Sequence, residues 1–125
     1  MTEDHVSLEP EVTDVRQRAD GVDIDLLVSP DILYLQGHFP ELPVVPGVAQ
    51  IDWAVVMADR FLGTDIGAAT NFKVKFRSII RPPIALTLEL RITARETGGT
   101  RRLTFEYLGS DGAFSTGAIQ LGLDE

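Results

Sequence analysis

Residues 36–53, QGHFPELPVVPGVAQIDW, decide how the rest of the chain is interpreted. The stretch contains one histidine, His38, followed by three prolines that each remove a backbone donor and fix φ. An apolar run then contains a single carboxylate, Asp52. Burying an ionised carboxylate without a partner is costly, so the place of Asp52 in the most apolar part of the chain needs an explanation.

The apolar run is predicted to form one helix, from Val48 to Leu62. Pro46 lies where the first helical position tolerates proline, and Gly63 lies where a glycine cap ends a helix. Arg60, in the last turn, is favourable to the helix dipole. Because the first part of this helix is apolar almost all round, we expect it to be buried on all sides.

Six further segments are predicted as strands, most of them with the period of two that is typical of a strand with one buried face. They are Val12–Arg18, Val22–Val28, Asn71–Ile79, Ile84–Arg95, Arg101–Leu108 and Ala113–Leu121. The order strand, strand, helix, four strands favours an α+β fold, with an antiparallel sheet of about six strands wrapped around one long central helix. The other face of that sheet then needs a partner or a polar surface.

Composition narrows the classes of function. The chain has 125 residues, no cysteine and a formal net charge of −8. Its length fits a single domain, 1–125, of which residues 1–10 are expected to form a loose leader. Nucleic-acid binding requires a basic surface and is set aside, and disulfides and thiolate metal sites are excluded. No apolar run approaches the ~18 residues of a membrane span, so we expect no span and a cytoplasmic protein.

His38 is a candidate general base. It lies between Gly37 and a proline-stiffened loop, and an unperturbed histidine pKa of roughly 6.5 lets it take and return a proton near neutrality. Asp52, in the second turn of the predicted helix, is the candidate acid partner. Plainer alternatives remain: His38 as a surface residue, and Asp52 as a core carboxylate bonded to a backbone amide, to Trp53 or to a tyrosine.

The start of the predicted helix is the third element of a candidate site. Val45 has no side-chain oxygen, so the amides of Gly47, Val48 and Ala49 begin the helix without a sequence-local acceptor. Such amides suit an anion or a polarised carbonyl oxygen, although water or a neighbouring carbonyl is the plainer occupant. Together the three elements indicate a base, an acid partner and an oxyanion donor.

The segment Gly37–Asp52, GHFPELPVVPGVAQID, resembles the active-site segment of the 3-hydroxyacyl-acyl-carrier-protein dehydratases of the FabA/FabZ type, whose pattern is GHFPxxPxxPGxxxx(E/D). The matching residues are Gly37, His38, Phe39, Pro40, Pro43, Pro46, Gly47 and Asp52. The segment Lys75–Pro83, KFRSIIRPP, is similar to the family's KFRxxVxPGD but lacks its Gly-Asp. The rest of the chain looks most like the ApeI-like dehydratases.

The resemblance implies a hotdog fold and a dimer, or a higher hotdog oligomer or a heterodimer with a related subunit, with sites at the interface. It implies that His38 removes the proton α to the thioester carbonyl and that Asp52 of the partner chain assists departure of the 3-hydroxyl. Gly47 would donate to the oxyanion, and Val48, Phe39 and Pro46 would contact substrate. It implies no cofactor, since the substrate is carried on the phosphopantetheine of an acyl carrier protein.

Three other functions stay open. A hotdog acyl-thioesterase would use a carboxylate to activate water at the carbonyl, a dehydratase-like subunit can be a structural partner without activity, and a lipid-binding module needs only a tunnel. The two candidate catalytic residues favour dehydration. The basic residues Lys73, Lys75, Arg77 and Arg81 are candidates for carrier docking, since acyl carrier proteins are acidic, although a solvated strand face is the plainer explanation.

Overall fold

The computed structural model describes residues 9–29, 44–64, 71–94 and 100–123. Within these ranges the elements occur in the order β1 (Glu11–Arg18), β2 (Gly21–Val28), α1 (Gly47–Leu62), β3 (Asn71–Phe76), β4 (Ile84–Ala94), β5 (Thr100–Gly109) and β6 (Gly112–Leu123). This order confirms the predicted α+β layout. The predicted strand from Asn71 ends at Phe76 rather than Ile79, because the next two amides, of Arg77 and Ser78, both donate to the carbonyl of Phe114.

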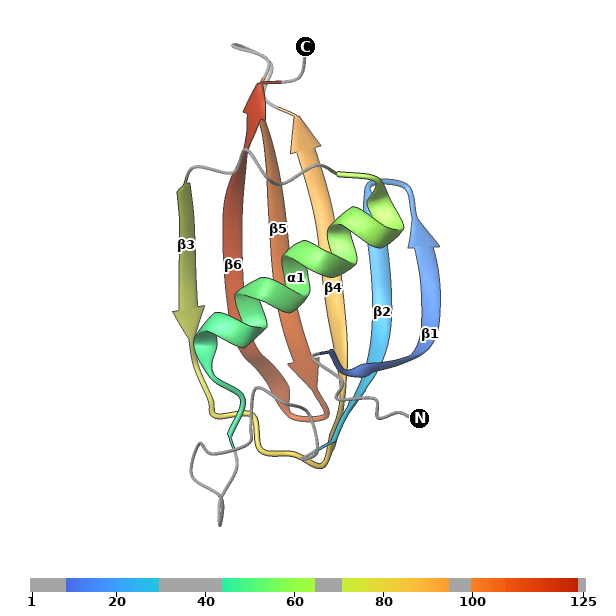
Figure 1. Ribbon diagram of the computed structural model, residues 1–125, viewed down its shortest axis with the longest axis vertical. Helices are drawn as coiled ribbons and strands as arrows, with labels where there is room; N and C mark the ends of the chain where they lie inside the picture. Colours follow the sequence, from blue (N-terminus) through green and yellow to red (C-terminus); the bar gives the residue numbers. More distant parts are fainter. Residues whose placement is uncertain (1–8, 30–43, 65–70, 95–99, 124–125) are drawn as a thin grey trace, which may run out of the picture.

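The six strands form one sheet with the order β1-β2-β4-β5-β6-β3, and all neighbours are antiparallel. Figure 1 shows α1 lying diagonally across one face of this sheet, with its first turn near the end of β3 and its last turn near β2. The two edges of the described sheet are therefore β1 and β3, and the helix begins beside the second of them.

The core lies between α1 and the sheet. Alternate residues of the strands point toward the helix, as the period of two predicts, and the buried apolar side chains of three central strands are Val22, Ile24, Leu26, Val28, Leu86, Leu88, Leu90, Leu103, Phe105 and Tyr107. Trp53 and Met57 of α1 are completely buried against them. Burial of these side chains stabilises the fold by about 25 cal/mol for each Å² of apolar surface.

The expectation that the helix is buried on all sides is wrong within the single chain. The buried positions are Ala49, Gln50, Trp53, Ala54, Met57 and Ala58, which form one face. On the opposite side Val48 is 68% exposed, and Asp52 and Val55 are half-buried. The reason is geometric: a single sheet covers one face of a helix.

Both ends of α1 follow their sequence signals closely. Pro46 is the N-cap residue, with φ −64° and ψ 153°, so the helix begins one residue later than the proline, at Gly47. Gly63 ends the helix in the left-handed conformation with φ 68°, as predicted. Arg60 lies in the last turn and pairs with Glu9 at 2.7 Å, which holds part of the expected leader against the helix.

The face of the sheet away from α1 is polar, which is one of the two outcomes expected for it. Asp23 is 4% exposed, and its two carboxylate oxygens each pair with an arginine. Oδ2 lies 2.7 Å from Nε of Arg18, and Oδ1 lies 2.8 Å from Nη2 of Arg91 in an ion pair without hydrogen-bond geometry. Burial raises the pKa of Asp23, but its two arginine partners outweigh burial and hold the pKa below its usual value. Beside it, Arg16 makes a bidentate pair with Asp25 at 2.8 Å.

A ring contact joins the end of β3 to the start of α1. A Cβ added at Gly47 would lie 2.6 Å from Cζ of Phe76, so glycine lets the ring lie directly on the first turn. The amide of Val45 also donates to the carbonyl of Ile80 at 2.9 Å. The segment that follows β3 is thereby hydrogen-bonded to the residues that precede the helix. The two segments that resemble the dehydratases, Gly37–Asp52 and Lys75–Pro83, are in contact here.

Gly47→Ala should lower the free energy of unfolding by about 1 to 3 kcal/mol, because the new methyl group displaces the Phe76 ring. In a Phe76→Ala background the same change should be neutral or stabilising, since alanine favours helix over glycine by up to about 1 kcal/mol. Urea titrations of the four proteins of this cycle measure both effects. An equal loss in the two backgrounds would show that the ring does not constrain Gly47.

Asp25 makes stability depend on pH. The hydrogen bonds from Arg16 and Thr87 lower its pKa to about 2. Because an unfolded aspartate has a pKa of about 3.9, these contacts stabilise the fold above that pH, and their contribution is lost as the pH falls toward 2. Asp25→Asn should therefore lower the melting temperature at neutral pH and make its decline on acidification less steep. Glu11→Gln, an exposed change on β1, is the control; identical acid profiles for wild type and Asp25→Asn would contradict the assignment.

Candidate active site at the start of the helix

The structure places only part of the predicted catalytic set. Asp52 lies in the second turn of α1, on the side turned away from the sheet, and is half-buried. His38 and Phe39 lie outside the described residues, so the pairing of His38 with Asp52 stays a prediction. Gly47 and Val48 form the first turn of the same helix, which puts two candidate donor amides one turn before the carboxylate.

Two of the three predicted open amides remain open within the described chain. Pro46 supplies no side-chain cap, and neither Gly47 nor Val48 has an acceptor for its amide among the described residues. The prediction for Ala49 is wrong, because its amide donates to the carbonyl of Pro46 at 3.1 Å, alongside that of Gln50 at 3.2 Å. The positive end of the helix dipole therefore presents two donors that can receive a carbonyl oxygen.

Gln50 is a residue of this region that the sequence reasoning missed. Its side chain is buried, and its Nε2 donates to the carbonyl of Val45 at 3.3 Å while its Oε1 accepts from Ser115 at 2.7 Å. Its backbone carbonyl accepts from the hydroxyl of Tyr107 at 2.7 Å. One polar position in an otherwise apolar first turn was the only signal in the sequence.

Tyr107 connects this hydrogen-bond group to the candidate acid. Its hydroxyl is completely buried, and burial, with the nearby negative charge of Asp52, raises its pKa well above the usual value. The hydroxyl bonded to Gln50 is therefore a neutral donor at physiological pH. One alternative for Asp52 is a hydrogen bond from a tyrosine hydroxyl. Tyr107 does not make that bond, because its hydroxyl donates to the carbonyl of Gln50.

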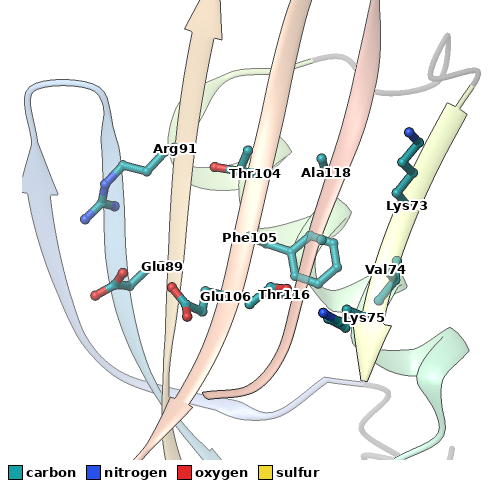
Figure 2. A pocket seen from close by; sticks show the side chains of 11 residues that line it. Lys73, Val74, Lys75, Glu89, Arg91, Thr104, Phe105, Glu106, Thr116 and Ala118 are labelled. Atoms are coloured by element: carbon teal, nitrogen blue, oxygen red, sulfur yellow. The ribbon is translucent and has the colours of Figure 1, made fainter. Parts of the chain in front are cut away.

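The four basic residues predicted for carrier docking lie in two parts of the chain, Lys73 and Lys75 on β3 and Arg77 and Arg81 in the segment that follows it. Lys73 and Lys75 point to the sheet face away from α1, as Figure 2 shows, where they line a groove of about 470 Å³ together with Glu89, Arg91 and Glu106. This groove is separated from Asp52 by the sheet. Arg77 and Arg81 are exposed and flank Ile80, whose carbonyl accepts from Val45 beside the helix start.

Large apolar side chains are exposed near the helix start and along β3. They are Val48 at 68%, Phe72 at 58%, Ile79 at 58% and Phe76 at 51%. Because β3 is an edge of the described sheet, its outer backbone groups can pair with another strand. Among the described residues no helix is long and apolar enough to span a membrane.

Comparison with known sequences agrees with these features. The profile of the ApeI-like family, described as ApeI dehydratase, matches residues 14–118. The FabZ 3-hydroxyacyl-[acyl-carrier-protein] dehydratase of Oenococcus oeni is 38% identical over 66 residues, with coverage of 47% of this chain and 48% of that protein. That of Syntrophobacter fumaroxidans is 35% identical over 81 residues, with coverage of 58% of this chain and 54% of that protein. The match thus spans about half the length of the curated relatives.

Solved structures share the fold. The dehydratase heterocomplex ApeI:P of Xenorhabdus doucetiae contains a chain that is 28% identical, with a TM-score of 0.72 and coverage of 91% of this chain and 99% of that one. An uncharacterized protein of Pyrococcus horikoshii, 12% identical with a TM-score of 0.67 and coverage of 97% and 87%, shares the fold alone. The sheet, the helix across it and the family match together show that this chain has the hotdog fold and belongs to the ApeI-like dehydratase family.

Proposed function

We propose that the protein is a (3R)-hydroxyacyl-[acyl-carrier-protein] dehydratase, which eliminates water to give a trans-2-enoyl thioester in fatty-acid, aryl-polyene or polyketide-like biosynthesis. The observation that carries the proposal is the helix start: a carboxylate, Asp52, stands one turn beyond the open amides of Gly47 and Val48. These groups belong to a segment that follows the dehydratase pattern residue by residue. An acid beside donors for a carbonyl oxygen is what elimination from a thioester requires.

In the proposed reaction His38 takes the proton from C2 of the substrate. The charge that develops on the thioester oxygen is stabilised by the amide of Gly47, assisted by Val48 at the positive end of the helix. The electron pair then forms the C2–C3 double bond and the C3–O bond breaks, while the carboxylate of Asp52 accepts a hydrogen bond from the 3-hydroxyl and orients it for departure. His38 gives the proton that it took to the departing oxygen, water leaves, and both groups are restored without a cofactor.

A second hotdog subunit completes the proposed site. The uncovered side of α1, with Val48 and Val55, and the exposed Phe72 and Phe76 of β3 offer apolar surface next to Asp52. A partner that covers this surface would remove the exposed apolar area and leave a lined passage for an acyl chain. We propose a dimer in which His38 of one chain meets Asp52 of the other, with Phe39 and Pro46 contacting the substrate.

The partner subunit is either a second copy of this chain or a related protein. The heterocomplex from Xenorhabdus doucetiae favours the second candidate, in which this chain works only beside another subunit or serves it without activity of its own. The presence of both His38 and Asp52 favours a catalytic subunit. A thioesterase would instead release a free thiol from the same substrates, which separates it from dehydration in a single assay.

His38→Ala and Asp52→Asn should each lower the turnover number by about 10² to 10⁴, because the first removes the general base and the second removes the carboxylate that orients the departing hydroxyl. Both variants should keep the melting temperature of the wild type, since in this proposal the two side chains act on the substrate and are not required for folding. Formation of enoyl thioester, followed by absorbance and mass, measures the rate. Asp52→Asn with full turnover and a large loss of stability would assign Asp52 to the core instead.

Mixing the two inactive variants tests whether the site is shared. If the protein is a homodimer, mixed dimers contain one site with both His38 and Asp52 and one with neither, so refolded mixtures should recover up to about a quarter of the wild-type activity. Each variant alone is the control. No recovery, with mixed dimers demonstrated by mass, would place both residues of a site on one chain.

Arg77→Glu and Arg81→Glu should raise KM for a carrier-bound substrate several-fold and leave a short pantetheine thioester almost unaffected. The two arginines flank the segment bonded to the helix start, so an acidic carrier bound there can deliver its arm toward Asp52. The carrier-dependent rate should also fall as salt rises.

Lys73→Glu and Lys75→Glu are the matched controls for carrier docking, because they make the same charge change on the sheet face away from α1. They should have little effect on either substrate. A larger effect of the lysine variants than of the arginine variants would move the docking surface to the groove of Figure 2.

A further inference from the structure

We infer that Gln50 is a positioning residue: through Val45, Tyr107 and Ser115 it fixes the first two turns of α1 and thereby sets the Gly47 amide and Asp52 in their working relation to the rest of the site. This inference rests on the proposed function, in which the amide and the carboxylate act on one substrate.

The contacts of Gln50 come from three separate parts of the chain. The segment before the helix contributes the carbonyl of Val45, β6 contributes the hydroxyl of Ser115, and β5 contributes the hydroxyl of Tyr107. Gln50 is 3% exposed, and Ser115 and Tyr107 are fully buried. Three hydrogen bonds with different directions restrain both rotation of the helix about its axis and sliding along it.

The two strand anchors belong to one row across the sheet. Tyr107 of β5 is the register partner of Ser115 of β6, and Ser115 is the register partner of Phe76 of β3. Phe76 is the residue whose ring lies on Gly47. The first turn of α1 therefore rests on three neighbouring strands at a single level of the sheet, with a polar contact at two of them and a ring contact at the third.

The first turn of the helix has little apolar packing of its own. Its buried apolar side chain is that of Ala49, whereas the large buried side chains, Trp53 and Met57, lie further along the helix. Hydrogen bonds are directional, and a buried polar group that loses its partner is costly, so the network makes one placement of the helix much better than its neighbours. Gly47 lies three residues before Gln50 and Asp52 lies two residues after it. Both are within one turn of Gln50, so they move with it as one rigid piece of helix.

Stability alone does not account for the network. A typical intramolecular hydrogen bond contributes a small net amount to folding, and an apolar side chain of similar size at position 50 would bury surface without the cost of desolvating an amide. What the network supplies is a unique position for the helix start. The Gly47 amide and Asp52 need such a fixed position, because they act on the same substrate and a misplacement of about 1 Å can lower a rate 10²-fold.

Ser115→Ala is the primary test, with Ile119→Val as its matched control. Both positions are fully or almost fully buried on β6, and both changes remove little volume, but of the two only Ser115 makes a hydrogen bond to Gln50. At a temperature where both variants are folded, Ser115→Ala should lower kcat about tenfold or more with KM within about twofold of wild type, whereas Ile119→Val should leave both near wild type. If Ser115→Ala and Ile119→Val lose the same stability and have equal kcat values, Gln50 has only a structural role and the inference is overturned.

Gln50→Glu supplies a readout that a structural role would not move. A protonated glutamic acid can donate to the Val45 carbonyl and accept from Ser115, as the amide does, whereas its ionised form faces the carbonyl oxygen with a charge. The ratio of variant to wild-type kcat should therefore rise as the pH falls. Gln50→Leu should be low at every pH. A pH-independent ratio for Gln50→Glu would contradict the positioning role.

Amide hydrogen exchange separates this inference from the proposed function. If the wild type dehydrates no 3-hydroxyacyl thioester, the proposed function fails, and the positioning claim is then decided by the amides of residues 47–52. Faster exchange there in Ser115→Ala than in Ile119→Val would support pinning of the first two turns. The same exchange in both variants would overturn it, whatever the activity of the wild type.

Discussion

The attachment of the first turn of α1 to one row of the sheet is the constraint on which the site depends. Tyr107 and Ser115 hold Gln50 by hydrogen bonds, and Phe76 lies on Gly47. These contacts place a helix start with two open amides at the edge of the sheet, beside β3. The rest of the helix is held by apolar packing of Trp53 and its neighbours against the sheet.

The uneven burial of the chain follows from having one sheet and one helix. The sheet covers one face of α1 and turns a network of aspartate–arginine pairs, such as Arg16–Asp25, to the other side. The remaining face of α1 stays open, with Val48 exposed and Asp52 half-buried. Residue 52 thus lies at the boundary between the folded chain and the surface that a second hotdog subunit would cover, where a carboxylate can be partly shielded and still meet a substrate.

Much of the fold could be predicted from the sequence because alternation and capping are local signals. The predicted helix begins at Val48 and the observed helix begins one residue earlier, at Gly47, and Gly63 ends it as expected. Features set by contacts between distant segments could not be predicted. The one-sided burial of α1 depends on the width of the sheet, and the bonds of Gln50 require the register of β5 with β6. The motif located Asp52 and the helix start, while the place of His38 lies outside the described residues.

The most direct test of this account is mass spectrometry of a (3R)-hydroxyacyl pantetheine thioester incubated with the wild-type protein, alone and with any related subunit with which it copurifies. The account predicts loss of one water to give the trans-2-enoyl thioester, and hydration of the enoyl thioester in the reverse direction. Release of free pantetheine thiol, or an unchanged substrate under every one of these conditions, would contradict it.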